Sequence, residues 1–257
     1  MKAVILAGGL GTRMREETEF RPKPMVEVGG KPVLWHIMKI YASQGVTEFV
    51  ILTGYKGEMI KKYFHDYSIL NRDFTVHIGD QPEVEYYGSH EEDGWKVTVV
   101  ETGELSLTGE RILRARSHIG DQPFFLTYGD GLANVDLAKL LEIHSKTEAV
   151  LTISTSRPQS RFGVVSMSDD GRVERFAEKP QGQELVNIGY MVANESIFNY
   201  LKQGGSLEEE PLASLVRDKL LSAHHHRGFW QPMDTVRELK LLTELWGKGA
   251  APWTQII

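Results

Sequence analysis

The stretch Ala3-Val4-Ile5-Leu6-Ala7-Gly8-Gly9-Leu10-Gly11-Thr12-Arg13, near the start of the chain, decides the fold class. Its first five residues form an apolar run bounded by glycine, which is typical of a strand buried on both faces of a parallel sheet. The glycines follow the carboxyl end of that strand, where open α/β sheets bind ligands. Their backbone N–H groups can point together at an anion. We therefore predict a central strand followed by a phosphate-binding loop.

Apolar runs and helical patterns alternate through the first part of the chain, which favours right-handed crossovers and a largely parallel sheet. The acidic stretch 80–93 is interpreted as a surface excursion. Helices are expected at 32–44, 57–66, 109–118 and 135–146, and strands at 48–52, 74–78, 95–100, 124–128 and 149–154.

The pattern changes after residue 155. Two short runs around Asp169-Asp170-Gly171, at 164–167 and 173–176, predict an antiparallel hairpin, and 187–192 predicts a further strand. Helices are expected at 195–202, 211–221 and 234–246. The predicted fold class is α/β, a mostly parallel Rossmann-like sheet with an appended mixed antiparallel region. We expect one domain over 1–257, with a first region at about 1–155 and a second region, which includes the C-terminal helices, at about 156–257.

Composition excludes several classes of protein. The 257 residues carry 29 Lys+Arg and 35 Asp+Glu, a net charge of −6 that gives no overall attraction to nucleic acid or an anionic membrane. The lack of cysteine excludes disulfides, thiolate metal sites and a cysteine nucleophile. No apolar window is long enough for a signal h-region or a membrane span. We expect a cytoplasmic protein that binds neither nucleic acid nor a membrane.

Three kinds of loop compete for the glycine-rich stretch. A dinucleotide fingerprint would need a third glycine where Met14 stands, and a Walker loop would need Gly-Lys-Ser/Thr where Thr12-Arg13 stands. A plain tight turn would not need so many glycines. Ten residues beyond Arg13, Lys23 lies between two prolines, which predict a stiff, extended segment that holds the ammonium in place. The loop and Lys23 together favour an anion site.

Two aspartates are candidate metal ligands, because Mg²⁺ prefers one or two carboxylates together with phosphate oxygens and water. Asp130, in Tyr128-Gly129-Asp130-Gly131, follows a strongly apolar strand; alternatively it belongs to an Asp-Gly turn. Asp234 precedes the last helix, where an aspartate is also a favoured N-cap.

The glycine loop with Lys23-Pro24-Met25 resembles the signature of the sugar-phosphate nucleotidylyltransferases, which have a GT-A-like fold. These enzymes join a nucleoside triphosphate to a sugar 1-phosphate and release pyrophosphate. The resemblance implies catalytic roles for Arg13, Lys23 and Asp130, and Mg²⁺ as cofactor on Asp130 and Asp234. It implies nucleotide contacts for the residues of the loop and of the segment before Asp130: Leu6, Ala7, Gly8, Gly9, Leu10, Gly11, Thr12, Arg13, Lys23 and Gly129.

The sugar side of the resemblance lies in the second half of the chain. Glu178-Lys179-Pro180 is similar to a family motif whose Glu contacts sugar hydroxyls and whose Lys contacts the sugar phosphate. Asn187-Ile188-Gly189-Tyr190 resembles the strand whose glycine backs the sugar. The implied sugar-phosphate ligands are therefore Glu178, Lys179, Asn187 and Gly189.

The base side resembles the branch of the family that uses CTP and glucose 1-phosphate and makes CDP-glucose. The residues that carry this are Glu101-Thr102-Gly103, Thr108-Gly109-Glu110-Arg111, the segment 228–235 and the ending Ala251-Pro252-Trp253. Thr108, Gly109 and Arg111 are the implied contacts near the base or triphosphate. A dTTP or UTP enzyme is the near alternative. A metal-dependent glycosyltransferase and a non-catalytic sugar-nucleotide sensor are more distant ones. The resemblance also suggests a homo-oligomer.

Overall fold

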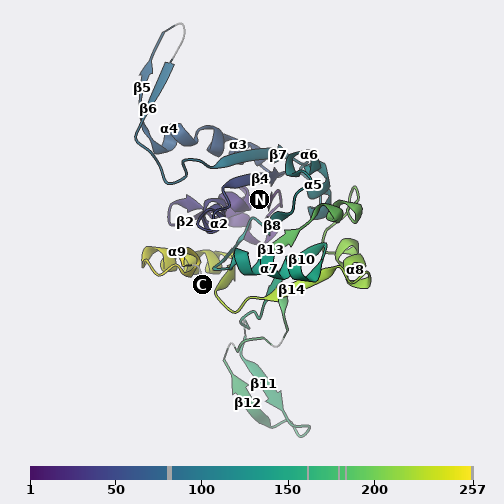
Figure 1. Ribbon diagram of the computed structural model, residues 1–257. Coiled ribbons are helices and arrows are strands. Elements are labelled where there is room, and N and C mark those ends of the chain that lie inside the picture. The colour runs from purple at the N-terminus through teal and green to yellow at the C-terminus, as the bar shows by residue number, and fades with distance from the viewer. Residues whose placement is uncertain (80–82, 161, 179, 183, 256–257) are drawn as a thin grey trace.

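The computed structural model describes residues 1–79, 83–160, 162–178, 180–182 and 184–255. Within these ranges, seven strands form one sheet in the order β14-β10-β13-β8-β1-β4-β7 (Figure 1). Their bounds are β1 Lys2–Ala7, β4 Glu48–Thr53, β7 Lys96–Glu101, β8 Phe124–Tyr128, β10 Leu151–Ser156, β13 Val186–Ala193 and β14 Leu221–His225. Adjacent strands are parallel except at β13, which runs antiparallel to both β8 and β10. The predicted mostly parallel α/β sheet is confirmed.

Helices cover both faces of this sheet. They are α1 Arg15–Thr18, α2 Val33–Ala42, α3 Gly57–His65, α4 Tyr67–Asn71, α5 Thr108–Arg114, α6 Arg116–Ile119, α7 Leu137–Thr147, α8 Glu210–Arg217 and α9 Val236–Gly247. Short 3-10 turns are η1 Thr12–Met14, η2 Lys23–Met25, η3 Glu195–Asn199 and η4 Pro252–Thr254. Of the helices among the described residues, none has the length and apolarity that crossing a membrane would require.

The buried residues of β1 explain why this strand is central. Ile5 is fully buried against the apolar cluster that contains α2 residues such as Ile37. Its neighbour Val4 is fully buried against the cluster on the other face, which includes Ile112 of α5. Because successive side chains of a strand point to opposite faces, an unbroken apolar run fits a strand covered on both sides.

The predicted strand at 74–78 does not join this sheet. Residues Asp73–His77 form β5, which pairs with β6, Glu83–Tyr87, in a separate antiparallel hairpin. The strand beside β4 is instead β7, from the predicted run 95–100. Every residue of β5 is exposed, and an apolar run alone does not distinguish a projecting hairpin from a sheet strand. The interpretation of 80–93 as a surface excursion agrees with the exposure of residues 83–87, but the sequence did not predict that these residues form the strand β6.

The second half of the chain contains the predicted hairpin and a strand that the sequence did not reveal. The hairpin is β11 Val164–Met167 paired with β12 Val173–Ala177. The predicted helix at 211–221 ends at Arg217, and Leu221–His225 forms β14, parallel to β10. The composition of β14 is polar and rich in histidine, so this edge strand lacks the apolar pattern from which a strand is predicted. The helix expected at 195–202 is the 3-10 turn η3, and the one expected at 109–118 is divided into α5 and α6.

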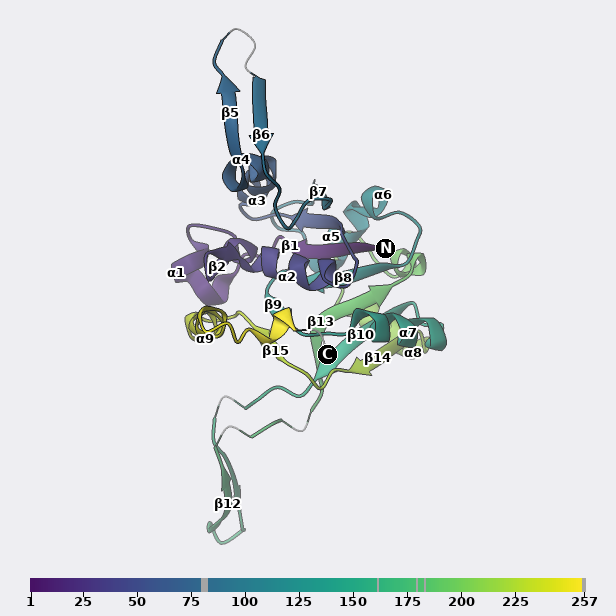
Figure 2. The same cartoon turned by 60° about the vertical axis from the view of Figure 1, so that its left-hand side comes forward.

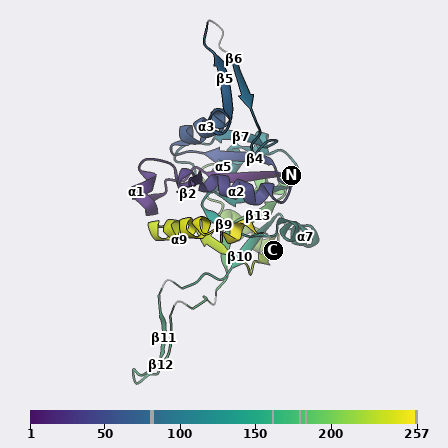
Figure 3. The same cartoon turned by 90° about the vertical axis from the view of Figure 1, so that its left-hand side faces the viewer.

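The two isolated hairpins project from the body in nearly opposite directions (Figures 2 and 3). The β5–β6 hairpin follows α4, and the β11–β12 hairpin leaves between β10 and β13. Two further short pairs stay on the body: β2 Glu27–Val28 with β3 Lys31–Pro32, and β9 Gly131–Ala133 with β15 Trp230–Pro232. The second of these is important for the site described below.

Candidate active site

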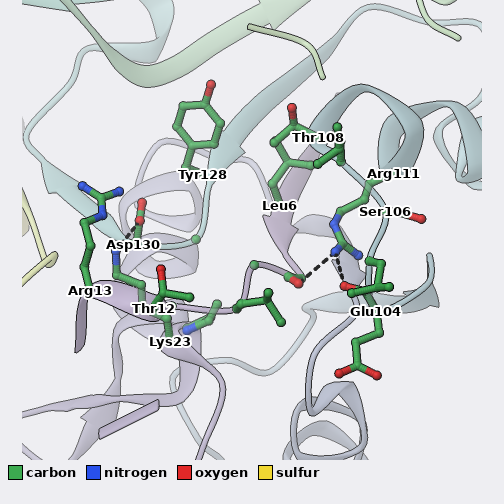
Figure 4. Close-up of a pocket in the computed structure, with 18 residues that line it drawn as sticks. Leu6, Thr12, Arg13, Lys23, Glu104, Ser106, Thr108, Arg111, Tyr128 and Asp130 are labelled. Atoms are coloured by element: carbon green, nitrogen blue, oxygen red, sulfur yellow. Dashed lines mark hydrogen bonds and ion pairs between the residues drawn. The ribbon is translucent and has the colours of Figure 1, made fainter. Parts of the chain in front are cut away.

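A cleft of about 430 Å³ opens at the carboxyl ends of β1 and β8. Figure 4 shows Arg13, Lys23 and Asp130 at one end and Thr108, Arg111 and Ser106 at the other. The residues that line it come from the glycine loop, η2, the segment before α5 and the end of β8: Leu6, Gly8, Gly9, Leu10, Gly11, Thr12, Arg13, Lys23, Pro24, Glu104, Leu105, Ser106, Leu107, Thr108, Arg111, Tyr128, Gly129 and Asp130.

The glycine loop passes directly from β1 into the turn η1. Gly11 has a φ of 63°, in the left-handed region that favours glycine, and Met14 N–H donates to its carbonyl over 3.0 Å. A short helix, α1, follows at once. At Gly8 the constraint is space, because a Cβ there would lie 2.3 Å from the guanidinium carbon of Arg111. Both glycines are therefore required by the backbone path and by the side chain packed behind it.

Lys23 lies where the two aspartates converge. Its ammonium donates to Oδ2 of Asp130 over 2.7 Å and to Oδ1 of Asp234 over 2.6 Å, and its side chain is only 10% exposed. Arg13 donates to the other oxygen of Asp234 over 2.6 Å from a side chain that is 71% exposed. Two cations and two carboxylates therefore meet at the mouth of the glycine loop.

The segment around Lys23 differs from the extended geometry predicted for it. Pro22 is extended, but Lys23–Met25 forms the 3-10 turn η2, in which Met25 N–H donates to the Pro22 carbonyl over 2.8 Å. Proline is tolerated in the first turn of a helix because no hydrogen bond is needed there from its nitrogen. Pro24 occupies such a position. The turn still holds Lys23 in one place, so the predicted rigidity comes from a different conformation.

The pairing of β9 with β15 brings Asp234 beside Asp130. Pro232 of β15 lies opposite Gly131 of β9, and Met233 N–H donates to the carbonyl of Asp130 over 2.8 Å. Asp234 does not cap α9: Thr235 does, with its hydroxyl accepting from Glu238 N–H in a capping box. The carboxylate of Asp234 is consequently directed to Lys23 and Arg13.

Arg111 is buried at the opposite end of the cleft, only 4% exposed, and binds several backbone segments at once. Its guanidinium donates to the carbonyls of Gly8, Thr53, Gly103 and Glu104 at 2.7 to 3.1 Å, and to the hydroxyl of Thr102 at 2.9 Å. Burial lowers the pKa of Arg111 from its ordinary value. The guanidinium thus joins the glycine loop to the ends of β4 and β7.

A family model described as "Nucleotidyl transferase" matches residues 2–233. The chain belongs to this family. Glucose-1-phosphate cytidylyltransferase of Salmonella typhi is 44% identical over 256 residues, covering 98% of each chain. A Bacillus subtilis protein named probable glucose-1-phosphate cytidylyltransferase is 44% identical over 255 residues, covering 98% of this chain and 99% of its own. A crystal structure titled as a putative glucose-1-phosphate thymidylyltransferase from Bacillus anthracis has a TM-score of 0.69 at 19% identity. It covers 98% of this chain and 95% of its own, which supports the fold.

Nucleotidyl transferases of this family typically use a divalent metal, and the aspartates fit one. One oxygen of Asp130 and one of Asp234 lie within hydrogen-bond distance of the same nitrogen, so both carboxylates face one point. Carboxylate oxygens, completed by phosphate and water, are the donors that Mg²⁺ prefers. Among the described residues, no group of three or more His, Cys, Asp or Glu side chains is placed to hold a metal ion.

Among the described residues, the predicted sugar-side residues Glu178, Asn187 and Gly189 are not part of the lining of this cleft. Gly189, on β13, adjoins it: its φ is 82°, and a Cβ there would lie 2.3 Å from Cδ2 of Tyr128. The side chain of Asn187 accepts from the N–H of Gly189 over 2.9 Å. Glu178 follows β12 in the projecting hairpin. Lys179 lies outside the described residues.

Several residues of the cleft were missed by the sequence analysis. The segment Glu104–Leu107 lines the end of the cleft near Arg111, and Pro24 and Tyr128 also line the cleft. The segment has no regular structure, so no periodicity marks it. Glu208, which the sequence analysis does not single out, accepts hydrogen bonds from Thr108 and Tyr128. Only the three-dimensional arrangement brings this carboxylate to the cleft.

Proposed function

We propose that the protein transfers a cytidylyl group from CTP to α-D-glucose 1-phosphate, giving CDP-glucose and pyrophosphate. The observation that carries the reaction class is the cluster of Arg13, Lys23, Asp130 and Asp234 beside the glycine loop. It brings two cations together with two carboxylates that can bind a metal, next to a loop suited to phosphate. The choice of CTP and glucose 1-phosphate rests on the two relatives that are 44% identical over nearly their whole length.

The chemistry needs no protein nucleophile. The second pKa of a phosphate monoester is about 6, so the oxygen of glucose 1-phosphate is largely anionic at pH 7. This oxygen forms a bond to the α-phosphorus of CTP while the bond from that phosphorus to the bridging β-phosphate oxygen breaks in line. Pyrophosphate leaves with the electron pair. The barrier comes mainly from bringing anions together, so positioning and charge neutralisation provide the catalysis.

Arg13 and Lys23 supply the cations of this scheme, and the loop from Leu6 to Thr12, with Gly129, surrounds the triphosphate. Lys23 can donate to phosphate oxygens from its fixed place on η2. Asp130 and Asp234 would hold Mg²⁺, which when bound neutralises phosphate charge and orients the oxygens. Until phosphate arrives, the carboxylates keep the ammonium of Lys23 at the loop.

At the base-side end, Thr108 lines the cleft at the first turn of α5, while Gly109 packs behind it against the backbone of residues 205–207. Arg111 acts there chiefly through the backbone. It binds the Gly8 carbonyl, and in a trans peptide the following N–H points the opposite way, so the N–H of Gly9 is directed away from the guanidinium. Within a single domain, we assign the nucleotide to residues 1–155 and the sugar phosphate to residues 156–257, on Glu178, Lys179, Asn187 and Gly189.

A panel of nucleotides tests the substrate assignment. Glucose 1-phosphate and Mg²⁺ are supplied with CTP, UTP, dTTP or GTP, and release of pyrophosphate is followed. CTP is expected to be used at least ~10-fold more efficiently than the others, about what 1.4 kcal/mol of discrimination at the base gives. Preference for UTP or dTTP would identify the near alternative. Sugar transfer from CDP-glucose to an acceptor without pyrophosphate would indicate a glycosyltransferase, and binding without turnover a sensor.

We further propose that the chain forms a homo-oligomer through its hairpins. The β11–β12 hairpin exposes Val165, Met167, Val173 and Phe176, and exposed apolar patches of this kind mark interaction surfaces. An isolated two-stranded hairpin is marginal in water, which favours its packing on a second copy. Sedimentation should give a multiple of 29.0 kDa, reduced by Val165→Glu with Phe176→Glu. A 29.0 kDa particle at working concentration would refute the assembly.

A further inference from the structure

Glu208 lies at the rim of the cleft, in the loop between η3 and α8, and its carboxylate joins two walls. Oε1 accepts a hydrogen bond from the Tyr128 hydroxyl over 2.5 Å, and Oε2 accepts from the Thr108 hydroxyl. Ser206 also donates to Oε2, over 2.5 Å. Tyr128 ends β8 and Thr108 begins α5, and both line the cleft. One side chain therefore bridges the end of a central strand and the start of a helix.

The backbone beneath Glu208 is fixed to the same helix. The carbonyl of Gly205 accepts from Glu110 N–H over 3.0 Å, and the N–H of Leu207 donates to the Thr108 hydroxyl oxygen over 2.9 Å. Leu207 itself is fully buried. The hydroxyl of Thr108 thus accepts from the loop and donates to Glu208. Glu208 is exposed and lies two residues before α8 begins at Glu210, but hydrogen bonds from Tyr128, Thr108 and Ser206 hold its carboxylate in place.

Through Tyr128, the hydrogen bonds of Glu208 reach the boundary between the proposed nucleotide and sugar-phosphate regions. It stands two residues before Asp130, and Gly189 of β13 packs against its ring. A shift of Tyr128 would therefore change the spacing between the nucleotide side and the sugar side. Displacements of about 1 Å can cost on the order of 100-fold in rate, since in-line attack requires aligned reactants.

The negative charge of Glu208 allows a positioning role to be distinguished from a purely electrostatic one. Partial burial would raise the pKa of its carboxyl, but hydrogen bonds from Ser206, Thr108 and Tyr128 outweigh this, so the pKa lies below its ordinary value. An ionised carboxylate repels anionic substrates. Charge alone thus predicts that removing Glu208 strengthens substrate binding. A positioning role predicts the opposite sign.

We propose that Glu208 is a positioning residue for nucleotidyl transfer, holding Tyr128 and Thr108 so that the walls of the cleft stay correctly spaced. This inference rests on the proposed function. It adds a residue from the loop before α8 to the machinery without placing that residue in contact with either substrate.

The test compares Glu208→Ala, Tyr128→Phe and their double variant with Glu209→Ala, which removes the same charge one residue away. We expect Glu208→Ala to raise the KM for glucose 1-phosphate and lower kcat/KM about 10- to 100-fold, within the range that misplacement causes. Tyr128→Phe should lower kcat/KM as well. Both variants break the hydrogen bond between Tyr128 and Glu208. The double variant should therefore lose no more kcat/KM than the single variant with the larger loss. Glu209→Ala should match the wild type.

Unchanged or improved kcat/KM in Glu208→Ala would overturn the inference, as would losses that multiply in the double variant. Loss of folded protein alone would lower apparent kcat and leave KM unchanged, which also counts against it. If Glu208→Ala does not fold, Tyr128→Phe provides the test. Wild-type kinetics in that variant would refute the positioning role of Glu208. Absence of CDP-glucose formation by the wild type would refute the proposed function instead.

Discussion

Lys23 is the proposed catalytic side chain most tightly surrounded by charged groups, because its ammonium binds both Asp130 and Asp234. Replacing it with alanine should lower kcat by about 10²- to 10³-fold, the usual cost of removing one electrostatic stabiliser of a transition state. Steady-state kinetics with CTP and glucose 1-phosphate provide the measurement. Lys62→Ala, on the exposed surface of α3, is the matched control and should retain full activity. Near-normal kcat in Lys23→Ala would remove Lys23 from the mechanism.

Asp234 tests the metal assignment. Asp234→Asn keeps the size of the side chain and removes its charge, so the Mg²⁺ concentration for half-maximal turnover should rise at least ~10-fold, the loss that outer-shell changes already cause. Titration of Mg²⁺ at saturating substrates gives this value. Glu244→Gln, on the outer surface of α9, should leave it unchanged. An unaltered Mg²⁺ requirement in Asp234→Asn would mean that Asp234 does not hold the metal.

Residue types and spacing identified several side chains that line the cleft, but they did not predict the contacts that these side chains make. The alternative role of Asp234 as an N-cap could have been rejected from sequence, since Thr235 and Glu238 form the Thr-x-x-Glu capping pattern. Its meeting with Asp130 was expected only from the family resemblance, because the contact depends on β9 and β15, which have three residues each. Strands so short leave no periodic signal.

At the scale of the element, helix α2 contains a buried histidine that makes stability depend on pH. His36 Nε2 lies 2.8 Å from the Val28 carbonyl, and Nδ1 lies 3.3 Å from the indole nitrogen of Trp253 in η4. The first contact requires Nε2–H as donor, and the second requires an unprotonated Nδ1. Burial lowers the pKa of His36 from 6.5 to about 4. The neutral ring therefore connects the C-terminal segment to α2.

The lowered pKa fixes the direction of the effect. The unfolded chain binds this proton below pH 6.5 and the folded chain only near pH 4, so the stabilisation is complete above pH 6.5 and is lost as pH falls toward 4. Between pH 7.5 and 5 this one group should lower the free energy of unfolding by about 2 kcal/mol. Urea unfolding of the wild type and of His36→Gln at both pH values measures it.

The variant supplies the comparison for that experiment. His36→Gln lacks the titrating group, so its free energy of unfolding should change less with pH than that of the wild type. His77→Gln, on the exposed strand β5, should behave as the wild type does. Equal pH dependence in His36→Gln and the wild type would contradict a neutral, buried His36.

At the scale of the whole molecule, the apolar runs predicted most of the sheet because burial on both faces demands continuous apolar sequence, as in β1, β4 and β8. The errors in strand prediction lie where a strand is not buried on both faces. The β5 run belongs to a projecting hairpin, and β14 is a polar edge strand whose pairing with β10 depends on distant residues. Strand order was also beyond sequence patterning, since the position of β13 between β8 and β10 is set by tertiary packing.

The central claim, transfer of the cytidylyl group of CTP to glucose 1-phosphate, is tested most directly by following labelled CTP. The protein is incubated with glucose 1-phosphate, Mg²⁺ and CTP labelled separately at the α- and the γ-phosphate. The account predicts that the α label enters CDP-glucose and the γ label enters pyrophosphate in equal amounts. The account would be contradicted if the α label did not enter a sugar nucleotide, or if it entered one without formation of pyrophosphate that carries the γ label.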